Sequence, residues 1–216
     1  MEELEEAKAL AKNIAYSLPK EINIAALSHI SMLPFKALSL RELLIHRASS
    51  LADGAVHLYE QNQAIPATVL TRAVFETTAL LYTLYERTKT FLEKNNTAEF
   101  DEFLIASLVG SRIDQDEDMI QAINVMNHIK RMEVAIPGTL RTYEILCEYA
   151  HPNWSGLQGA YGKIDRNTFI MNLGTRPNRN KTGISALCGS LISFSHYYNE
   201  LIDPIRELNA HFENSY

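Results

Sequence analysis

Hydrophobic and polar residues follow each other along this chain with the spacing of α-helices. Between residues 38 and 62, apolar side chains recur every three or four positions, as in a helix with a buried face: Leu40, Leu43, Leu44, Leu51, Ala55, Leu58 and Tyr59. A short polar turn then leads to Pro66, which suits a first helical position, and a second apolar segment runs to about Lys94. Two long helices joined by a short turn predict an antiparallel hairpin.

The remaining segments also predict an all-α fold. We expect an acidic amphipathic helix over residues 2–17, shorter helices over 98–109, 117–133 and 137–150, and a long C-terminal helix over 183–212 that bends at Pro204. The glycine-rich stretch 153–180 breaks this pattern, and its Thr168–Met171 segment has strand character. The sequence therefore predicts one helical domain over 1–216, with 1–35 as an N-terminal extension and a long loop at 153–180 that could hold a small β-hairpin.

Composition narrows the class of protein. The 216 residues are 46% hydrophobic and carry a net charge of −6, which argues against a surface devoted to nucleic acid. The acidic first residues lack the basic and apolar regions of a secretory signal, and the charge-free run 182–199 contains polar residues that favour a buried helix over a membrane span. We expect a cytoplasmic protein without membrane association, in which both cysteines are reduced.

One charged pair stands out in the second long helix. From Ala67 to Leu84 the only charged residues are Arg72 and Glu76, four positions apart and therefore on one face. Because the rest of this segment is apolar, the helix should be buried on several sides. The pair is interpreted either as a structural ion pair or as the polar lining of a cleft.

A histidine follows the helix predicted over 137–150. Pro152 disfavours helical geometry at His151, so the helix should end there with an accessible imidazole. Histidine is well suited to acid–base chemistry near neutral pH, although at a helix end it is also a common cap. Glu148 and His151 have the Glu-x-x-His spacing of di-metal bundles, but the chain has no second such motif. We therefore predict neither a metal nor a cofactor.

Basic and aromatic residues flank this end of the chain. Arg176, Arg179 and Lys181 precede the last helix, whose first backbone N–H groups favour anions. The side chains predicted to contact a ligand are Glu148, Asn153, Trp154, Tyr161, Arg176, Arg179 and Lys181. Trp154 and Tyr161 could stack on a base, or they could pin the loop to the bundle.

Arg41 and His46 form an isolated Arg-x-x-x-x-His pattern. Five positions on a helix place two side chains more than one turn apart, and such a short pattern arises easily by chance. We interpret both residues as structural.

The helical hairpin from Leu40 to Tyr85, with Arg72-x-x-x-Glu76 on its second helix, resembles the core of HEPN domains (higher eukaryotes and prokaryotes nucleotide-binding). The segment from Tyr143 to Pro152 is similar to a Tyr-x-x-Leu-Ser/Cys-Glu-Tyr-x-His-Pro motif of uncharacterised bacterial HEPN-like proteins. The resemblance covers residues 38–205 and implies a HEPN-like bundle.

HEPN ribonucleases use Arg-x-x-x-x-His near a helix end, usually in a homodimer, to cleave RNA without metal in toxin–antitoxin or defence systems. The resemblance therefore implies a catalytic role for His151, with Arg72 and Glu76 beside it. It also requires an arginine at position 146, where this chain has Leu146. Arg72 could replace that cation from the neighbouring helix.

Three functions stay open on these grounds. The first is a HEPN-like protein of a bacterial defence or toxin–antitoxin system that binds RNA or a nucleotide, with an altered or lost ribonuclease site. The second is a non-catalytic interaction module, such as an antitoxin, immunity factor or accessory subunit, that binds a protein encoded nearby. The third is a bundle that binds a small ligand or metal.

Overall fold

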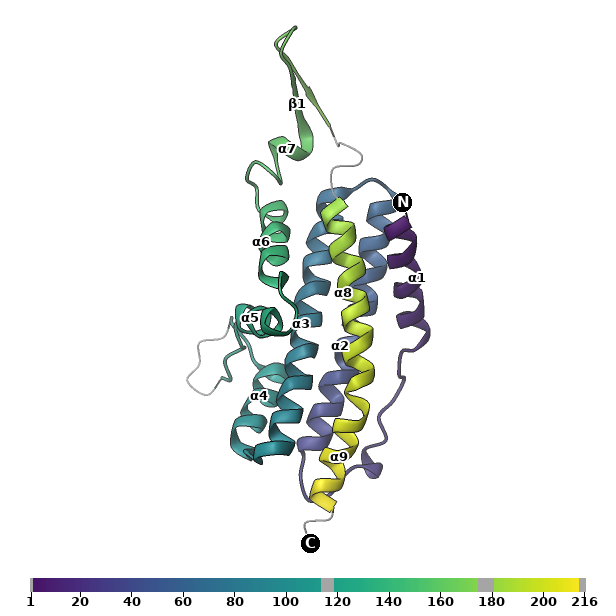
Figure 1. Cartoon of the computed structure of the whole chain (residues 1–216), viewed down its shortest axis with the longest axis vertical. Coiled ribbons are helices and arrows are strands. Elements are labelled where there is room, and N and C mark those ends of the chain that lie inside the picture. Colours follow the sequence, from purple (N-terminus) through teal and green to yellow (C-terminus); the bar gives the residue numbers. More distant parts are fainter. Residues whose placement is uncertain (1, 114–118, 175–180, 214–216) are drawn as a thin grey trace.

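The computed structural model describes residues 2–113, 119–174 and 181–213, and these are mostly helical. Figure 1 shows a bundle of long helices with shorter ones along one side and a β-hairpin that projects from one end. The helices are α1 (Glu2–Tyr16), the 3-10 turn η1 (Ile24–Ala26), α2 (Leu33–Glu60), α3 (Ala64–Lys94), α4 (Thr97–Val109), α5 (Val125–Ala135), α6 (Thr139–Ala150), α7 (Gln158–Tyr161), α8 (Lys181–Glu200) and α9 (Ile202–Glu213). The strands are β1 (Gly162–Asp165) and β2 (Ile170–Leu173).

The predicted helical hairpin is confirmed as α2 and α3. Asn62, in the turn between them, has a φ of 57°, a left-handed conformation that asparagine tolerates better than most residues. Asn95 ends α3 in the same conformation, and its N–H donates to the Phe91 carbonyl at 2.7 Å. Pro66 is the third residue of α3, within the first turn, where its missing N–H costs nothing.

The main core lies between α1, α2, α3, α8 and α9. Its fully buried side chains include Ile45, Leu81, Leu84, Leu191 and Phe194. Helix α3 is the centre of the molecule, because it packs on α2 and α8 and, along another side, on α5 and α6. A second, smaller core joins α3, α5, α6 and α8 through Phe75, Ala79, Ile129, Met132, Tyr143, Leu146 and Ala186.

Two helix boundaries differ from those that the sequence predicts. The helix expected to start near Glu117 begins instead at Val125, where the Asn124 side chain accepts a hydrogen bond from the Met126 N–H at 3.0 Å. The start predicted at Glu117 was wrong because the Asn124 side chain caps the helix eight residues later. The last predicted helix is interrupted at Leu201, between α8 and α9, three residues before Pro204. Pro204 lacks the N–H that would bond the Glu200 carbonyl, which explains an interruption of the helix here.

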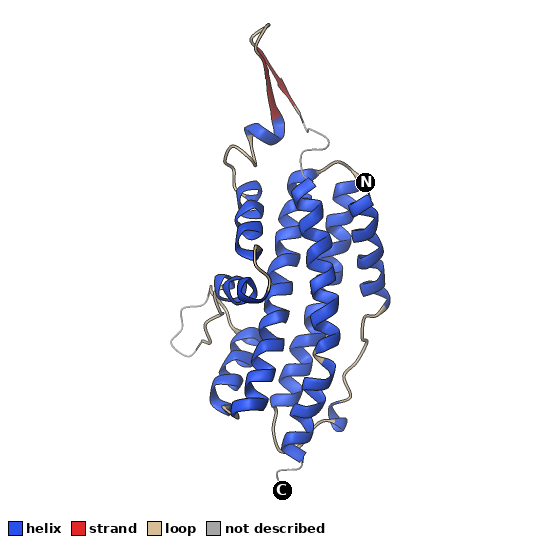
Figure 2. Cartoon of the chain, in the orientation of Figure 1, coloured by secondary structure: helices blue, strands red, loops and turns tan. Residues whose placement is uncertain are grey.

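Strands β1 and β2 form an antiparallel hairpin within the predicted glycine-rich loop. Gly162 pairs with Leu173 and Ile164 with Met171. Asp165 shapes the turn, because its Oδ1 accepts from the Asn167 N–H at 2.8 Å. Figure 2 shows the hairpin as the one β element drawn, standing away from the helices on the short helix α7.

Helix α3 is the one helix in the described ranges that is long and apolar enough to cross a membrane. Half of its most apolar window is buried inside the bundle, as is common for the central helix of a water-soluble fold. The length and hydropathy of α3 are therefore only weak evidence for a membrane span.

Candidate functional site

Arg72 and Glu76 meet a third residue, Tyr143 of α6. The Arg72 Nε donates to Glu76 Oε1 at 3.0 Å, as the four-residue spacing predicts. A second guanidinium nitrogen donates to the Tyr143 hydroxyl at 3.0 Å, and that hydroxyl donates to Glu76 Oε1 at 2.8 Å. The three side chains thus close a hydrogen-bonded triangle that ties α3 to α6.

Burial and packing fix the Tyr143 side chain in this triangle. Its ring lies 6.3 Å from that of Phe75 in a stacked arrangement, and Tyr143 as a whole is only 4% exposed. Burial, followed by the hydrogen bond to the Glu76 carboxylate, raises the pKa of Tyr143 to about 12. The phenol is therefore neutral at physiological pH and acts as a hydrogen-bond donor.

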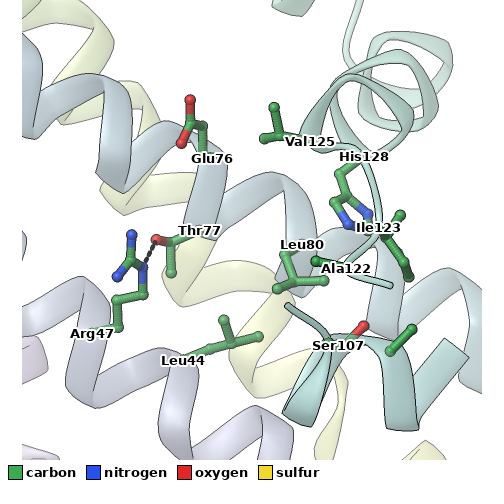
Figure 3. A pocket seen from close by; sticks show the side chains of 12 residues that line it. Leu44, Arg47, Glu76, Thr77, Leu80, Ser107, Ala122, Ile123, Val125 and His128 are labelled. Atoms are coloured by element: carbon green, nitrogen blue, oxygen red, sulfur yellow. Dashed lines mark hydrogen bonds between the residues drawn. The ribbon is translucent and has the colours of Figure 1, made fainter. Parts of the chain in front are cut away.

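Glu76 also lines a pocket of about 230 Å³ (Figure 3). Helices α2, α3, α4 and α5 and the segment before α5 supply its walls: Leu44, Arg47, Glu76, Thr77, Leu80, Ala106, Ser107, Gly110, Ala122, Ile123, Val125 and His128. The chain crosses itself closely at Gly110, where a Cβ would lie 2.8 Å from the Ala122 Cα and closer still to the Ala106 carbonyl. Only glycine allows this closure of the pocket rim.

Arg47 and Ser107 bring two polar side chains to this pocket. The Arg47 Nε donates to the Thr77 hydroxyl at 3.2 Å (Figure 3). This hydrogen bond orients the guanidinium at the pocket. The buried Ser107 Oγ has no hydrogen-bond partner within the described residues. An unsatisfied buried hydroxyl is costly, so this oxygen marks a place where a water or ligand atom would be stabilised.

His128 is the imidazole of the pocket, and it was not singled out in the sequence. The Thr83 hydroxyl donates to the Ala79 carbonyl at 2.9 Å, so it must accept from His128 Nδ1, which lies 3.1 Å away. This assignment leaves the Nε2 of the neutral ring as an acceptor. Burial, together with the nearby Arg131 and Arg87, lowers the pKa of His128 from 6.5 to about 4. The ring is therefore uncharged at pH 7 and a poor general base.

This lowered pKa makes a testable prediction about acid stability. The imidazole takes up a proton near pH 6.5 in the unfolded chain but only near pH 4 in the folded protein. The contribution of the neutral His128 to the free energy of unfolding is therefore complete above pH 6.5 and is lost as the pH falls toward 4. We expect the wild-type protein to lose about 2 kcal/mol more than His128→Asn between about pH 7.5 and 4.5. Urea unfolding of both proteins at each pH measures the difference. Equal losses in the two proteins would contradict the buried, neutral imidazole.

His151 lies apart from the Arg72–Glu76 pair. It is the exposed C-cap of α6, as predicted, with its N–H donating to the Cys147 carbonyl at 3.0 Å. Eight residues separate it from Tyr143, which is about 12 Å along a helix. Within the described residues, no hydrogen bond or ion pair joins His151 to Arg72 or Glu76. The predicted three-residue site is thus assembled only in part, and Tyr143 occupies the place expected for the imidazole.

Leu146 is wholly buried, at 0% exposure, in the smaller core. This is the position at which the HEPN resemblance requires an arginine. A side chain that points into an apolar core between α3, α5 and α6 cannot reach a substrate phosphate.

Arg41 and His46 are both held by structural contacts, as interpreted from the sequence. The Arg41 guanidinium forms an ion pair with Glu42, lies 3.6 Å from the Tyr198 ring centroid and donates to the Tyr198 carbonyl. The Tyr198 hydroxyl in turn donates to Glu42. His46 Nε2 lies 2.8 Å from the Pro19 carbonyl and joins α2 to the segment after α1.

The residues predicted to bind a substrate lie around the end of α6. The Asn153 side chain donates to Glu148 at 2.5 Å and accepts from the Ser155 N–H, so both residues shape the turn after α6. Trp154 is 66% exposed, and the Tyr161 carbonyl accepts from Gly174. Lys181 is exposed at the start of α8, while Arg176 and Arg179 lie outside the described residues.

The described residues include no group of three or more His, Cys, Asp or Glu side chains placed to hold a metal ion.

Comparison of the chain with protein-family models, curated proteins and solved structures gave no match. The HEPN resemblance therefore rests on the residues quoted above and stays a prediction.

Proposed function

We propose that this protein is a HEPN-like helical module that acts by binding and has lost ribonuclease chemistry. In this proposal it serves as an interaction subunit, such as an antitoxin, immunity factor or accessory protein, of a bacterial defence or toxin–antitoxin type system. Its partner would be a protein encoded nearby.

The observation that carries the proposal is the complete burial of Leu146. Phosphate recognition by a HEPN ribonuclease needs a free cation beside the histidine, and here that position belongs to the core. Arg72, the substitute considered from the sequence, already donates to Glu76 and Tyr143. His151 is left exposed at the helix end without a neighbouring guanidinium among its described hydrogen bonds and ion pairs.

The proposal predicts that the purified protein does not cleave RNA through His151. Labelled single-stranded and structured RNAs are incubated with the wild-type chain and with His151→Ala in the presence of a chelator, and products are separated on a gel. We expect the two proteins to give the same background, because Leu146 stands where the motif has a cation and Arg72 is already bonded to Glu76 and Tyr143. A circular dichroism spectrum of the variant controls for folding. Cleavage that is lost specifically in His151→Ala would overturn the proposal.

A second function, RNA or nucleotide binding without cleavage, is favoured by the exposed Trp154. This ring is 66% exposed beside the end of α6, and it is the only tryptophan of the chain, so its fluorescence reports on this surface alone. Stacking of a base on such a ring is worth about 1–3 kcal/mol. Saturable quenching by RNA or a nucleotide, without cleavage, would support this function over protein binding.

A further inference from the structure

The pocket lined by Glu76 has a rim that the backbone holds in place. The Ser111 N–H donates to the Ile120 carbonyl at 2.9 Å, and the Ala122 N–H donates to the Ser111 carbonyl at 3.1 Å. Together with the close approach of Gly110 to Ala122, these hydrogen bonds fix the wall between α4 and α5. A wall that is ordered before a ligand arrives lowers the entropy that binding costs.

The pocket is large enough for a small organic molecule. Its volume of about 230 Å³ exceeds the roughly 150 Å³ of an engineered apolar cavity that takes up benzene. Much of its lining is aliphatic: Leu44, Leu80, Ala106, Ala122, Ile123 and Val125. A ligand that fits this space therefore has an apolar body, of about the size of one ring with a few further atoms.

Arg47 gives the pocket a positive character. It forms no ion pair within the described residues, and its terminal nitrogens have no acceptor there. The Glu76 carboxylate, in contrast, is already bonded by Arg72 and Tyr143. His128, whose pKa is lowered to about 4, is neutral at pH 7. The pocket is thus suited to an anion, and a carboxylate matches the fork of guanidinium donors.

The wall formed by α4 and α5 carries a hydroxyl that lacks a partner. Buried hydroxyls in other helices donate to the carbonyl four residues earlier, as Thr78 and Ser190 do at 3.0 and 2.6 Å. The Ser107 hydroxyl makes no such bond and has no partner within the described residues. His128 lines the same pocket, and its Nε2 is an acceptor because Nδ1 donates to Thr83. A ligand hydroxyl suits this wall, because it can accept from a serine and donate to an imidazole nitrogen.

We propose that this pocket binds a small monocarboxylate that has an apolar body and a hydroxyl at the end opposite the carboxylate. The carboxylate pairs with Arg47 of α2, and the hydroxyl bonds Ser107 of α4. Figure 3 shows these two side chains on opposite sides of the pocket, with Leu44 and Leu80 between them. The site is separate from the surface at the end of α6 and does not rest on the function proposed above.

Isothermal titration calorimetry of the full-length protein at pH 7 with three small probes tests the proposal. We expect 4-hydroxyphenylacetate to bind with a dissociation constant of about 0.1–1 mM, which is weak because Arg47 is exposed and its ion pair stays partly hydrated. Phenylacetate lacks the hydroxyl and should bind about fivefold more weakly. Tyramine carries an ammonium group in place of the carboxylate and should give no saturable heat.

Two single substitutions assign the ends of the ligand. Arg47→Gln should weaken the binding of 4-hydroxyphenylacetate about fivefold or more, because the carboxylate loses its cation. Ser107→Ala should reduce 4-hydroxyphenylacetate to the affinity of phenylacetate and leave phenylacetate itself unchanged, since both changes remove the same hydrogen bond. Arg141→Gln is the matched control, because it removes a guanidinium from the exposed face of α6 and should leave all affinities as in the wild type.

Ala106→Leu provides a test that does not depend on charge. The larger side chain fills the pocket, so neither carboxylate probe should bind, while thermal unfolding followed by circular dichroism checks that the variant is folded. The proposal fails if 4-hydroxyphenylacetate shows no saturable binding up to about 10 mM. It fails equally if binding persists in both Arg47→Gln and Ala106→Leu, because the ligand then lies elsewhere, or if tyramine binds as tightly as the acid.

Discussion

Glu42→Ala should lower the free energy of unfolding by about 3–5 kcal/mol, because it leaves the Arg41 guanidinium without its counter-charge inside the bundle. Both residues are only 8% exposed, and the ion pair is extended by Tyr198, whose hydroxyl donates to Glu42. Burial, with the hydrogen bond to Glu42, raises the pKa of Tyr198, so the phenol stays neutral and cannot take over the role of the carboxylate. Urea unfolding at pH 7 measures the loss.

The matched control for Glu42→Ala is Glu144→Ala. Glu144 forms an ion pair with Arg141 at 3.5 Å on the exposed face of α6, with side-chain exposures of 54% and 76%. Such a pair contributes about 0.5 kcal/mol or less. The double variant Arg41→Met/Glu42→Leu should lose less than Glu42→Ala, because it removes both charges together. Similar losses for Glu42→Ala and Glu144→Ala would contradict the structural role assigned to this network.

Leu146→Arg should abolish stable folding, although it restores the arginine that the HEPN motif requires. Replacing a fully buried leucine removes its contribution to the core, which for Leu→Ala is about 2–5 kcal/mol. A buried guanidinium without a partner adds a further penalty, so the total approaches the stability of a whole domain, about 5–15 kcal/mol. Thermal unfolding followed by circular dichroism measures the effect.

Two controls separate burial from charge in this experiment. Leu146→Met conserves the volume and should cost less than about 1.5 kcal/mol. Glu144→Arg places the same cation two residues away on the exposed face of α6 and should change stability by about 0.5 kcal/mol or less. If Leu146→Arg instead folded with wild-type stability and cleaved RNA, the loss of ribonuclease chemistry proposed here would be refuted.

The candidate site is organised around Glu76, which belongs both to the hydrogen-bonded triangle and to the pocket. It bonds Arg72 and Tyr143, and it lines the pocket together with Arg47 and Ser107. A ligand in this pocket that competes for the Glu76 carboxylate would therefore loosen the link between α3 and α6. His128, neutral at pH 7, offers an acceptor nitrogen in the same pocket but little capacity to remove a proton.

The sequence was informative where structure depends on neighbours along the chain. Helical periodicity predicted the α2–α3 hairpin, and the spacing of Arg72 and Glu76 predicted their ion pair. The last predicted helix is interrupted three residues before Pro204. The glycine-rich loop also contained the expected small hairpin. These features depend on local hydrogen bonds, backbone restrictions and side chains one turn apart, all of which short segments specify.

The sequence by itself thus determined most of the helices and the absence of an arginine at position 146, although it misplaced the start of α5. Only the tertiary structure decided that Leu146 is buried, that Tyr143 rather than His151 completes the Arg72–Glu76 pair, and that Ser107 and His128 share a pocket. The physical reason is distance along the chain. Contacts between α3, α4, α5 and α6 depend on how whole helices pack, and periodicity within one segment carries no information about which partner its buried face will meet.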